Sequence, residues 1–251
     1  MQAEDSGHQP RRTLVIGASS AIARALIVKI LSDTTNEQVV AVSRSVDQAF
    51  CEAFGENLEW IRSDYTEFSI DEIVTRLTHL QGGIQRVFIC NGVLHDRFIF
   101  PEKRLEELRS DAFSEVFHVN ALIPILWIKH IKKLVKRGSE FTLTVFSARV
   151  ASIDDNKRGG WYSYRTSKAA LNMLLMTASI EYSRLSDRVR FLAFHPGTTD
   201  TPLSKPFQKS VSPNQLFSPE FVAGRLLEIN DGLAQGPVIQ YLDWNGKNIS
   251  W

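Results

Sequence analysis

A tyrosine and a lysine, Tyr164 and Lys168, stand four residues apart in a segment whose pattern predicts a helix. This spacing places both side chains on one helical face. Ser147 precedes Tyr164 by seventeen residues and offers a hydroxyl that can hold a developing oxyanion. A phenol beside an ammonium group and a hydroxyl could protonate the alkoxide formed when a hydride reaches a carbonyl. Such pairs also arise by chance, so their position in the fold decides what they mean.

Seven short apolar segments, rich in β-branched residues, predict the strands that would position these side chains. They are residues 13–16, 38–42, 58–61, 86–90, 141–146, 189–194 and 238–241. Helical patterns lie at residues 21–31, 48–54, 69–80, 105–135 (interrupted at Pro124) and 161–185. This alternation predicts a single α/β domain, Rossmann-like and doubly wound around a mostly parallel seven-stranded sheet, over residues 12–251. Residues 1–11 form a polar N-terminal tail.

The ligand of such a sheet binds beyond the carboxyl ends of its strands, where this sequence places glycines and polar residues. Residues 17–23 read GASSAIA, a turn whose backbone N–H groups can receive a pyrophosphate. An ordinary strand-to-helix turn capped by serine explains these residues equally well. The candidates for cofactor contact are Gly17, Ser19, Ser20, Ile22, Ser43, Arg44, Asp64, Tyr65, Asn91, Gly92, Tyr164, Lys168, Pro196, Gly197, Thr199 and Thr201.

Arg44 follows the second predicted strand, where an acidic residue usually meets a free ribose 2′-hydroxyl. Its planar guanidinium group matches a 2′-phosphate instead, so the sequence predicts NADP(H) as the cofactor. A solvated surface arginine is the alternative. Asp64 could accept a hydrogen bond from the adenine amino group, and Gly92 would let the backbone approach a ribose.

Taken together, GASSAIA, Asn91-Gly92, Asn120, Ser147, Tyr164-x-x-x-Lys168 and Pro196-Gly197 resemble the short-chain dehydrogenase/reductase family, in its order and spacing. The resemblance extends from Arg12 to Tyr241. Residues 160–164 and 243–247 look like the C-factor and sniffer-like carbonyl reductase group within that family. The resemblance implies an NAD(P)(H)-dependent oxidoreductase whose catalytic residues are Asn120, Ser147, Tyr164 and Lys168.

The resemblance also implies a role for each residue of this set. Tyr164 is the acid, Ser147 holds the substrate oxygen, and Asn120 places a water that relays protons to Lys168. Lys168 holds the nicotinamide ribose and, with the oxidised nicotinamide, lowers the pKa of Tyr164 from near 10 to about 7. The chain departs from the TGxxxGxG pattern of the family, because Ile16 replaces threonine and Ala21 and Ala23 replace glycines.

Two functions remain open at this point. One is the reduction of an aldehyde or ketone; the other is an NADP(H)-binding regulatory or signalling protein with little turnover. The Tyr/Lys/Ser set favours the first, and the alanines in the phosphate turn favour the second. We expect a small-molecule pocket built from residues 93–98, 148–152 and 202–217. His95 could meet the substrate there, and Arg149 could attract an anionic group.

Composition argues against other partners. The chain has 29 Lys and Arg against 28 Asp and Glu, so it lacks the basic field that a nucleic acid requires. The longest apolar run, residues 121–128, is too short to span a membrane. The six histidines show no metal-ligand spacing, and we expect no metal. With no secretory signal and with Cys90 in an apolar run, we expect a cytoplasmic protein.

The helices predicted over residues 105–135 and 161–185 are apolar on nearly every face. A helix between a sheet and water should show one apolar stripe, so a second cover is needed. We expect a homodimer or homotetramer in which these helices pair with their symmetry mates, with Leu175 in the contact. Alternatively, the segment after Phe217 folds over them within one chain.

Overall fold

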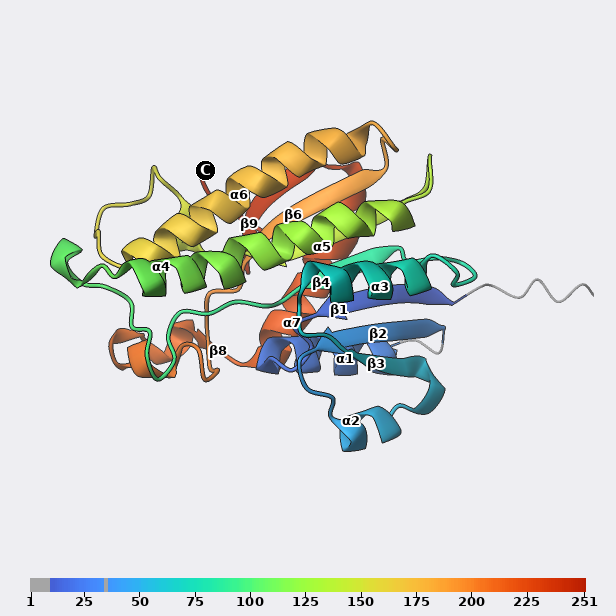
Figure 1. Ribbon diagram of the computed structural model, residues 1–251, viewed down its shortest axis with the longest axis horizontal. Coiled ribbons are helices and arrows are strands. Elements are labelled where there is room, and N and C mark those ends of the chain that lie inside the picture. The colour runs from blue at the N-terminus through green and yellow to red at the C-terminus, as the bar shows by residue number, and fades with distance from the viewer. Residues whose placement is uncertain (1–9, 34–35) are drawn as a thin grey trace, which may run out of the picture.

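Seven parallel strands form one sheet in the computed structural model, which describes residues 10–33 and 36–251 (Figure 1). The strand order is β3-β2-β1-β4-β5-β6-β9. The strands are β1 (Arg11–Ile16), β2 (Glu37–Ser43), β3 (Leu58–Arg62), β4 (Arg86–Ile89), β5 (Phe141–Phe146), β6 (Val189–His195) and β9 (Ile239–Asp243). β7 (Thr198–Thr199) pairs with β8 (Leu216–Phe217) outside the main sheet.

This topology confirms the predicted doubly wound α/β fold. β1 pairs with β2 and β4, so that Val15 lies opposite Ala41 on one side and Phe88 on the other. The chain order reverses between β1 and β4, and a ligand crevice forms at such a switch point. Residues 1–9 of the predicted tail lie outside the described residues, and β1 begins at Arg11.

Helices cover both faces of the sheet, and each covered face has its own core (Figure 1). α1 (Ala21–Asp33), α2 (Gln48–Glu52) and α7 (Pro219–Asp231) lie on one face. α3 (Glu67–Leu77), α5 (Ile123–Ile131) and α6 (Tyr162–Ser183) lie on the other, and α4 (Ser110–Phe117) precedes α5 and contacts α6. Neighbouring strand residues alternate between the cores: Leu14 and Ile16 belong to one and Val15 to the other.

A π-helical turn, His118–Leu122, joins α4 to α5. The sequence predicted an interruption at Pro124, and the irregularity lies just before that residue. Proline has no N–H to donate to the carbonyl of Asn120, four residues earlier. The N–H of Ile123 instead reaches back five residues to the carbonyl of His118. The widened turn therefore lies at Asn120, one of the predicted catalytic residues.

By length and composition alone, the helical stretch Ser110–Leu134 could span a membrane, although the longest apolar run in the sequence is short. Its packing accounts for this composition. Ile123, Trp127 and Ile131 are buried in the core between the helix and the sheet.

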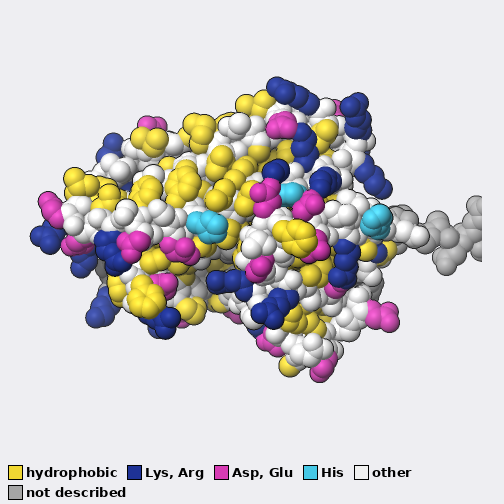
Figure 2. Space-filling view, viewed as in Figure 1, with side chains coloured by type: hydrophobic (Ala, Val, Ile, Leu, Met, Phe, Trp, Pro, Cys, Tyr) yellow, Lys and Arg dark blue, Asp and Glu magenta, His cyan; other side chains and the backbone are white. Residues whose placement is uncertain are grey.

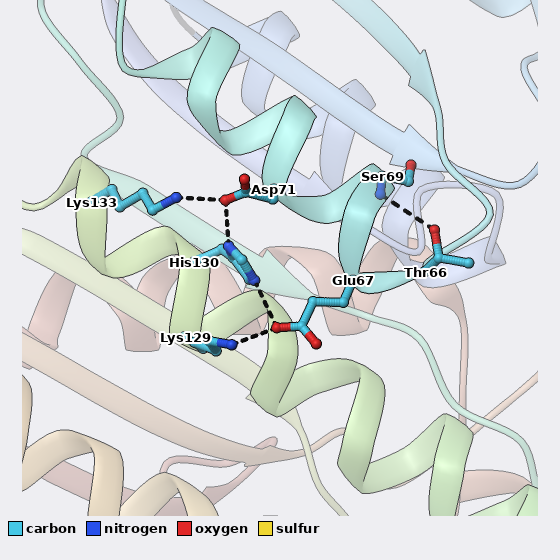
Figure 3. Close-up of polar contacts among 7 residues, drawn as sticks. All are labelled: Thr66, Glu67, Ser69, Asp71, Lys129, His130 and Lys133. Atoms are coloured by element: carbon cyan, nitrogen blue, oxygen red, sulfur yellow. Dashed lines mark hydrogen bonds and ion pairs between the residues drawn. The ribbon is translucent and has the colours of Figure 1, made fainter.

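Ion pairs join α5 and the turn that follows it to α3 on one side (Figure 3) and to α6 on the other. His130 Nδ1 lies 2.8 Å from Asp71 Oδ1, and its Nε2 lies 3.4 Å from Glu67 Oε1. Lys129 also pairs with Glu67, and Lys133 pairs with Asp71. These contacts, those of the lysines first, lower the pKa of both α3 carboxyl groups. On the other side of α5, Lys132 pairs with Glu181 of α6.

The outer face of α6 carries exposed apolar side chains among polar ones, but the predicted Leu175 is not one of them. Leu175 is 1 % exposed because it points into the core over the sheet, so its placement in a contact between protomers is wrong. On α6, Met173 and Ile180 are 67 % and 55 % exposed. Leu122, in the π-helical turn between α4 and α5, is also exposed. Figure 2 shows hydrophobic side chains gathered over α5 and α6. α7 packs against α1 on the opposite face and does not cover them.

Candidate active site

A cavity of about 460 Å³ lies at the carboxyl ends of the central strands. It brings together residues that follow β1, β4, β5 and β6 with two side chains of α6. Twelve of the predicted site residues line it: Ser19, Ser20, Ile22, Asn91, Gly92, Ser147, Tyr164, Lys168, Pro196, Gly197, Thr199 and Thr201. Arg44 and Asp64 follow β2 and β3 at the same edge of the sheet, outside this lining.

The turn after β1 depends on Gly17, whose φ is +77°. A Cβ atom on Gly17 would lie 2.6 Å from the backbone nitrogen of Asn91, so only glycine allows the turns after β1 and β4 to lie this close. Ser20 caps α1 by accepting hydrogen bonds from the N–H groups of Ala23 and Arg24. Ala23 is buried in the core, whereas Ala21 lines the cavity. Of the two alanines that replace family glycines, only Ala21 adds a methyl group at the site.

Lys168 and Tyr164 both face the cavity, as their spacing predicts. Lys168 is 3 % exposed, and its Nζ donates to the carbonyl of Phe146 at 2.7 Å. The same Nζ lies 6.0 Å from the centre of the Tyr164 ring. Desolvation lowers the pKa of Lys168 to about 8.

The pKa of Tyr164 is raised above its ordinary value, first by desolvation and then by the neighbouring phenol of Tyr241. The lowering expected from the sequence included the charge of the oxidised nicotinamide, and the protein's own groups alone act in the opposite direction. The physical reason is that loss of water disfavours the phenolate, while the ammonium group of Lys168 donates to the Phe146 carbonyl. The protein's own groups therefore keep the hydroxyl protonated at neutral pH.

Asn120 is completely buried beside the cavity, and its side chain holds the loop after β4. Its Oδ1 accepts from the N–H of Val93 at 2.7 Å, and its Nδ2 donates to the carbonyl of Val93 and to Ser167 Oγ. A Cβ atom on Gly92 would lie 3.4 Å from Asn120 Oδ1 and 3.5 Å from Lys168 Nζ. Gly92 thus allows the β4 loop to pass close to both groups.

Ser147 belongs to a buried polar network that sequence reasoning missed. Its Oγ donates to Asn172 Oδ1 at 2.6 Å. The Tyr241 hydroxyl donates to the carbonyl of Ala148 at 2.5 Å and lies close enough to Asn172 and Ser147 to interact with both. Desolvation nevertheless raises the pKa of Tyr241 to about 12. Asn172 was detectable, since it continues the four-residue spacing of Tyr164 and Lys168 along one helical face.

The prediction that Ser43 and Tyr65 contact the cofactor is wrong as far as their side chains are concerned. The Ser43 hydroxyl is buried, donates to the carbonyl of Ser45 and accepts from Trp60 Nε1. Tyr65 packs in the core against Trp127, and its hydroxyl donates to the carbonyl of Val42. Both side chains point into the protein, where their hydrogen bonds hold the ends of β2 and β3.

Arg44 and Asp64 follow β2 and β3, and their contact with the adenosine half of a dinucleotide stays a prediction. Arg44 is exposed at the end of β2. One oxygen of Asp64 accepts hydrogen bonds from the N–H and the hydroxyl of Thr66. Sequence reasoning missed Arg24, which lines the cavity from α1 and pairs with Asp47 at 2.7 Å.

The structure revises two further expectations about the substrate region. Arg149 pairs with Asp155 and Asp243 at 3.3 and 3.2 Å, so its charge is already matched and the predicted attraction of an anion is not supported. His95 Nε2 lies 3.1 Å from the carbonyl of Leu203, and its ring contacts Phe207. His95 therefore joins the loop after β4 to the segment 202–217.

The cavity fits a nicotinamide dinucleotide. Two polar atoms of its lining residues, Asn91 Oδ1 and Thr199 Oγ1, are buried without a hydrogen-bond partner. Buried polar atoms are nearly always paired, so these two are available to a polar ligand. Among the described residues, no three His, Cys, Asp or Glu side chains lie together as a metal site would require, and the absence of a metal stays a prediction.

The profile of the short chain dehydrogenase family matches residues 11–212. The chain belongs to the short-chain dehydrogenase/reductase family. This oxidoreductase is 30% identical over 241 residues to a 1-hydroxy-2-glutathionyl-2-methyl-3-butene dehydrogenase of Rhodococcus sp. (strain AD45), covering 95% of this chain and 98% of the relative. It is also 30% identical over 138 residues to the C-signal of Myxococcus xanthus, covering 55% of this chain and 78% of that protein.

The same fold occurs in an NADPH-bound carbonyl reductase from chicken fatty liver, with a TM-score of 0.81. The match covers 97% of this chain and 100% of that chain at 22% identity. At an identity this low, the match shows that the two proteins share the fold.

Proposed function

We propose that this protein reduces an aldehyde or ketone to the alcohol with NADPH as the hydride donor. The observation that carries the proposal is one cavity lined by Tyr164, Lys168 and Ser147 together with the turn after β1. The Rhodococcus relative, a dehydrogenase, and the NADPH-bound carbonyl reductase support it. Oxidation of NADPH with a panel of carbonyl compounds, followed by absorbance, tests it.

Each part of the cavity has a task in this proposal. Gly17, Ser19, Ser20 and Ile22 hold the pyrophosphate, since the turn opens the N-terminus of α1. Lys168, with Asn91 and Gly92, holds the nicotinamide ribose. The residues that hold the nicotinamide are Pro196, Gly197, Thr199 and Thr201. When bound, NADPH supplies the hydride.

The protein's own side chains handle the proton. The raised pKa of Tyr164 keeps its hydroxyl protonated, so it can give its proton to the carbonyl oxygen. Ser147 holds that oxygen once its hydroxyl turns away from Asn172. Pro124 has no N–H to donate to the carbonyl of Asn120, and in this proposal that carbonyl holds a water that passes protons to Lys168.

A regulatory or signalling protein of the same fold is the second candidate. Ala21 in the lining favours it, because a methyl group stands where a phosphate approaches the backbone. NADPH binding without turnover of any carbonyl in the panel would favour this candidate.

We also propose that the protein works in the cytoplasm. Cys51 and Cys90 are free thiols. Desolvation raises the pKa of Cys90, which keeps that thiol in its unreactive form and suits a reducing compartment.

Replacing Arg44 by aspartate should reverse the preference for NADPH. The exposed guanidinium group would pair with the 2′-phosphate, a charge-assisted contact worth roughly ten- to a hundredfold in affinity. Titrations of NADPH and NADH into the wild type and the variant measure this. Arg137→Asp makes the same change of charge just before β5, where the strands begin rather than end, and should leave both affinities unchanged. Equal affinities for the two cofactors in the wild type would refute the assignment.

The protein should form a homodimer or a homotetramer built on it. Met173 and Ile180 present an apolar surface on α6 that a second copy would cover by a twofold contact. Light scattering should therefore give at least twice the chain mass of 28.4 kDa. Met173→Glu should yield a folded monomer, whereas Val28→Glu on α1, on the opposite face, should not. A wild-type monomer at micromolar concentration would disprove the assembly.

A further inference from the structure

We propose that Glu102 is a positioning residue for Tyr164. Its carboxylate caps the N-terminus of α6 from the loop after β4 and fixes the helical turn that carries the phenol. The inference rests on the proposed role of Tyr164, but the contacts of Glu102 are independent of that role.

Glu102 is a buried acidic residue outside the predicted catalytic set, with 4 % of its surface exposed. One carboxylate oxygen accepts from the N–H of Ser163 at 3.2 Å, and the other accepts from the Ser163 hydroxyl. Its main-chain carbonyl accepts from the N–H of Trp161 at 2.5 Å. Three contacts therefore join this residue to the start of α6, two of them with Ser163, 61 positions along the chain.

The helix needs such a partner. The first N–H groups of an α-helix have no acceptor within the helix, and a side chain just before it usually supplies one. Trp161 stands at that position in α6 and makes no side-chain cap. A carboxylate also suits the positive end of the helix dipole. Glu102 supplies both the acceptor and the charge from a distant part of the chain.

The backbone entering α6 is held in an unusual conformation at the same place. Gly159, Gly160 and Trp161 have φ values of +64°, +68° and +55° in succession. Tryptophan rarely adopts a left-handed conformation, so the surrounding contacts must enforce it. A Cβ atom on Gly160 would lie 3.2 Å from the carbonyl oxygen of Glu102, which shows how closely the two segments approach.

Trp161 extends this arrangement to the reacting group. Its ring meets the ring of Tyr164 edge-on, with centres 6.1 Å apart. On its other side it contacts Phe207 of the segment 202–217, at 5.0 Å. The Glu102 contacts thus fix the backbone that leads into α6. The Trp161 ring in turn contacts both Tyr164 and Phe207, which lies in the segment expected to line the substrate pocket. A shift of an ångström at a proton donor is enough to slow a reaction strongly.

Two substitutions distinguish the loss of the hydrogen-bond acceptors of Glu102 from a change in the volume of its side chain. Glu102→Met keeps the length of the side chain and loses both acceptors, so kcat should fall about tenfold or more while the KM for NADPH changes less than about twofold. Glu102→Gln should restore kcat to within about threefold, because its amide can accept from the Ser163 N–H and donate to the Ser163 oxygen. Ser218→Ala removes the cap of α7 and should lower stability without changing kcat.

Amide hydrogen exchange gives a readout that needs no turnover. Exchange in a peptide spanning residues 159–168 should become at least about tenfold faster in Glu102→Met than in the wild type and stay slow in Glu102→Gln. Peptides from β1 should exchange equally in all three. If Glu102→Met fails to fold, Glu102→Asp, which draws the carboxylate back by one methylene, should show the same pattern to a smaller degree.

The outcomes distinguish this inference from the proposed function. Unchanged exchange at the start of α6 in Glu102→Met, or a kcat that falls equally in Glu102→Met and Glu102→Gln, would overturn the positioning role. A wild-type protein that reduces no carbonyl would refute the proposed function, while faster exchange in Glu102→Met would still support the capping contact.

Discussion

Replacing Tyr164 by phenylalanine is expected to lower kcat for carbonyl reduction by about a thousandfold, while the dissociation constant for NADPH changes less than about threefold. The phenol lines the cavity, and its raised pKa keeps the proton that the new alkoxide must receive. Phenylalanine keeps the ring that meets Trp161 and removes only the hydroxyl. Steady-state kinetics and fluorescence titration of NADPH measure the two effects separately.

Tyr162→Phe is the matched control, because it removes a hydroxyl from the same turn of α6 outside the cavity lining. It should retain wild-type kcat. If Tyr164→Phe kept near-wild-type reduction, the acid would have to be another group and the assignment of Tyr164 would be incorrect.

Lys168→Met is expected to lower kcat about a hundredfold or more and to weaken NADPH binding as well. The ammonium group is buried beside Gly92 and Tyr164, where no other described lysine lines the cavity. Its loss removes both the charge beside the phenol and the donor to the nicotinamide ribose. Kinetics and cofactor titration on the same preparation should therefore both change.

The wild type should also lose activity as the pH rises through about 8. Desolvation lowers the pKa of Lys168 to about 8, so the charged form is present below this pH and is lost above it. A profile of kcat/KM against pH measures this, with Lys168→Arg as the comparison. Arginine keeps its charge, so any activity that this variant retains should not decline near pH 8. A wild-type profile that stays flat to pH 10 would contradict the role of the ammonium group.

The sequence was sufficient for the sheet and for most of the cavity, because both follow from local patterns. Apolar runs predict strands, and residues that follow parallel strands must meet at one edge of the sheet. Gly17, Asn91, Ser147 and Gly197 came together for this reason.

The errors arose where a side chain's direction or partner is set by distant residues. Ser43 ends its strand with its hydroxyl turned to Trp60, which lies on another strand. A helix that is apolar all round cannot show which side faces the sheet, so Leu175 was placed outward and Met173 was overlooked. The partner of Arg149 on β9 and the contacts of Glu102 with α6 join segments 94 and 61 positions apart, beyond the reach of any local pattern.

The π-helical turn at Asn120 also constrains how the length of this chain can change. Each residue of an α-helix advances the side-chain direction by about 100°. A π-helical turn holds one extra residue while the helices on either side stay in line. Deleting one residue between His118 and Leu122 would remove the wide turn and change the direction of the side chains within it, so that Asn120 would leave the loop that it holds. Homologous sequences should therefore tolerate insertions and deletions before Ser110 far better than within this turn.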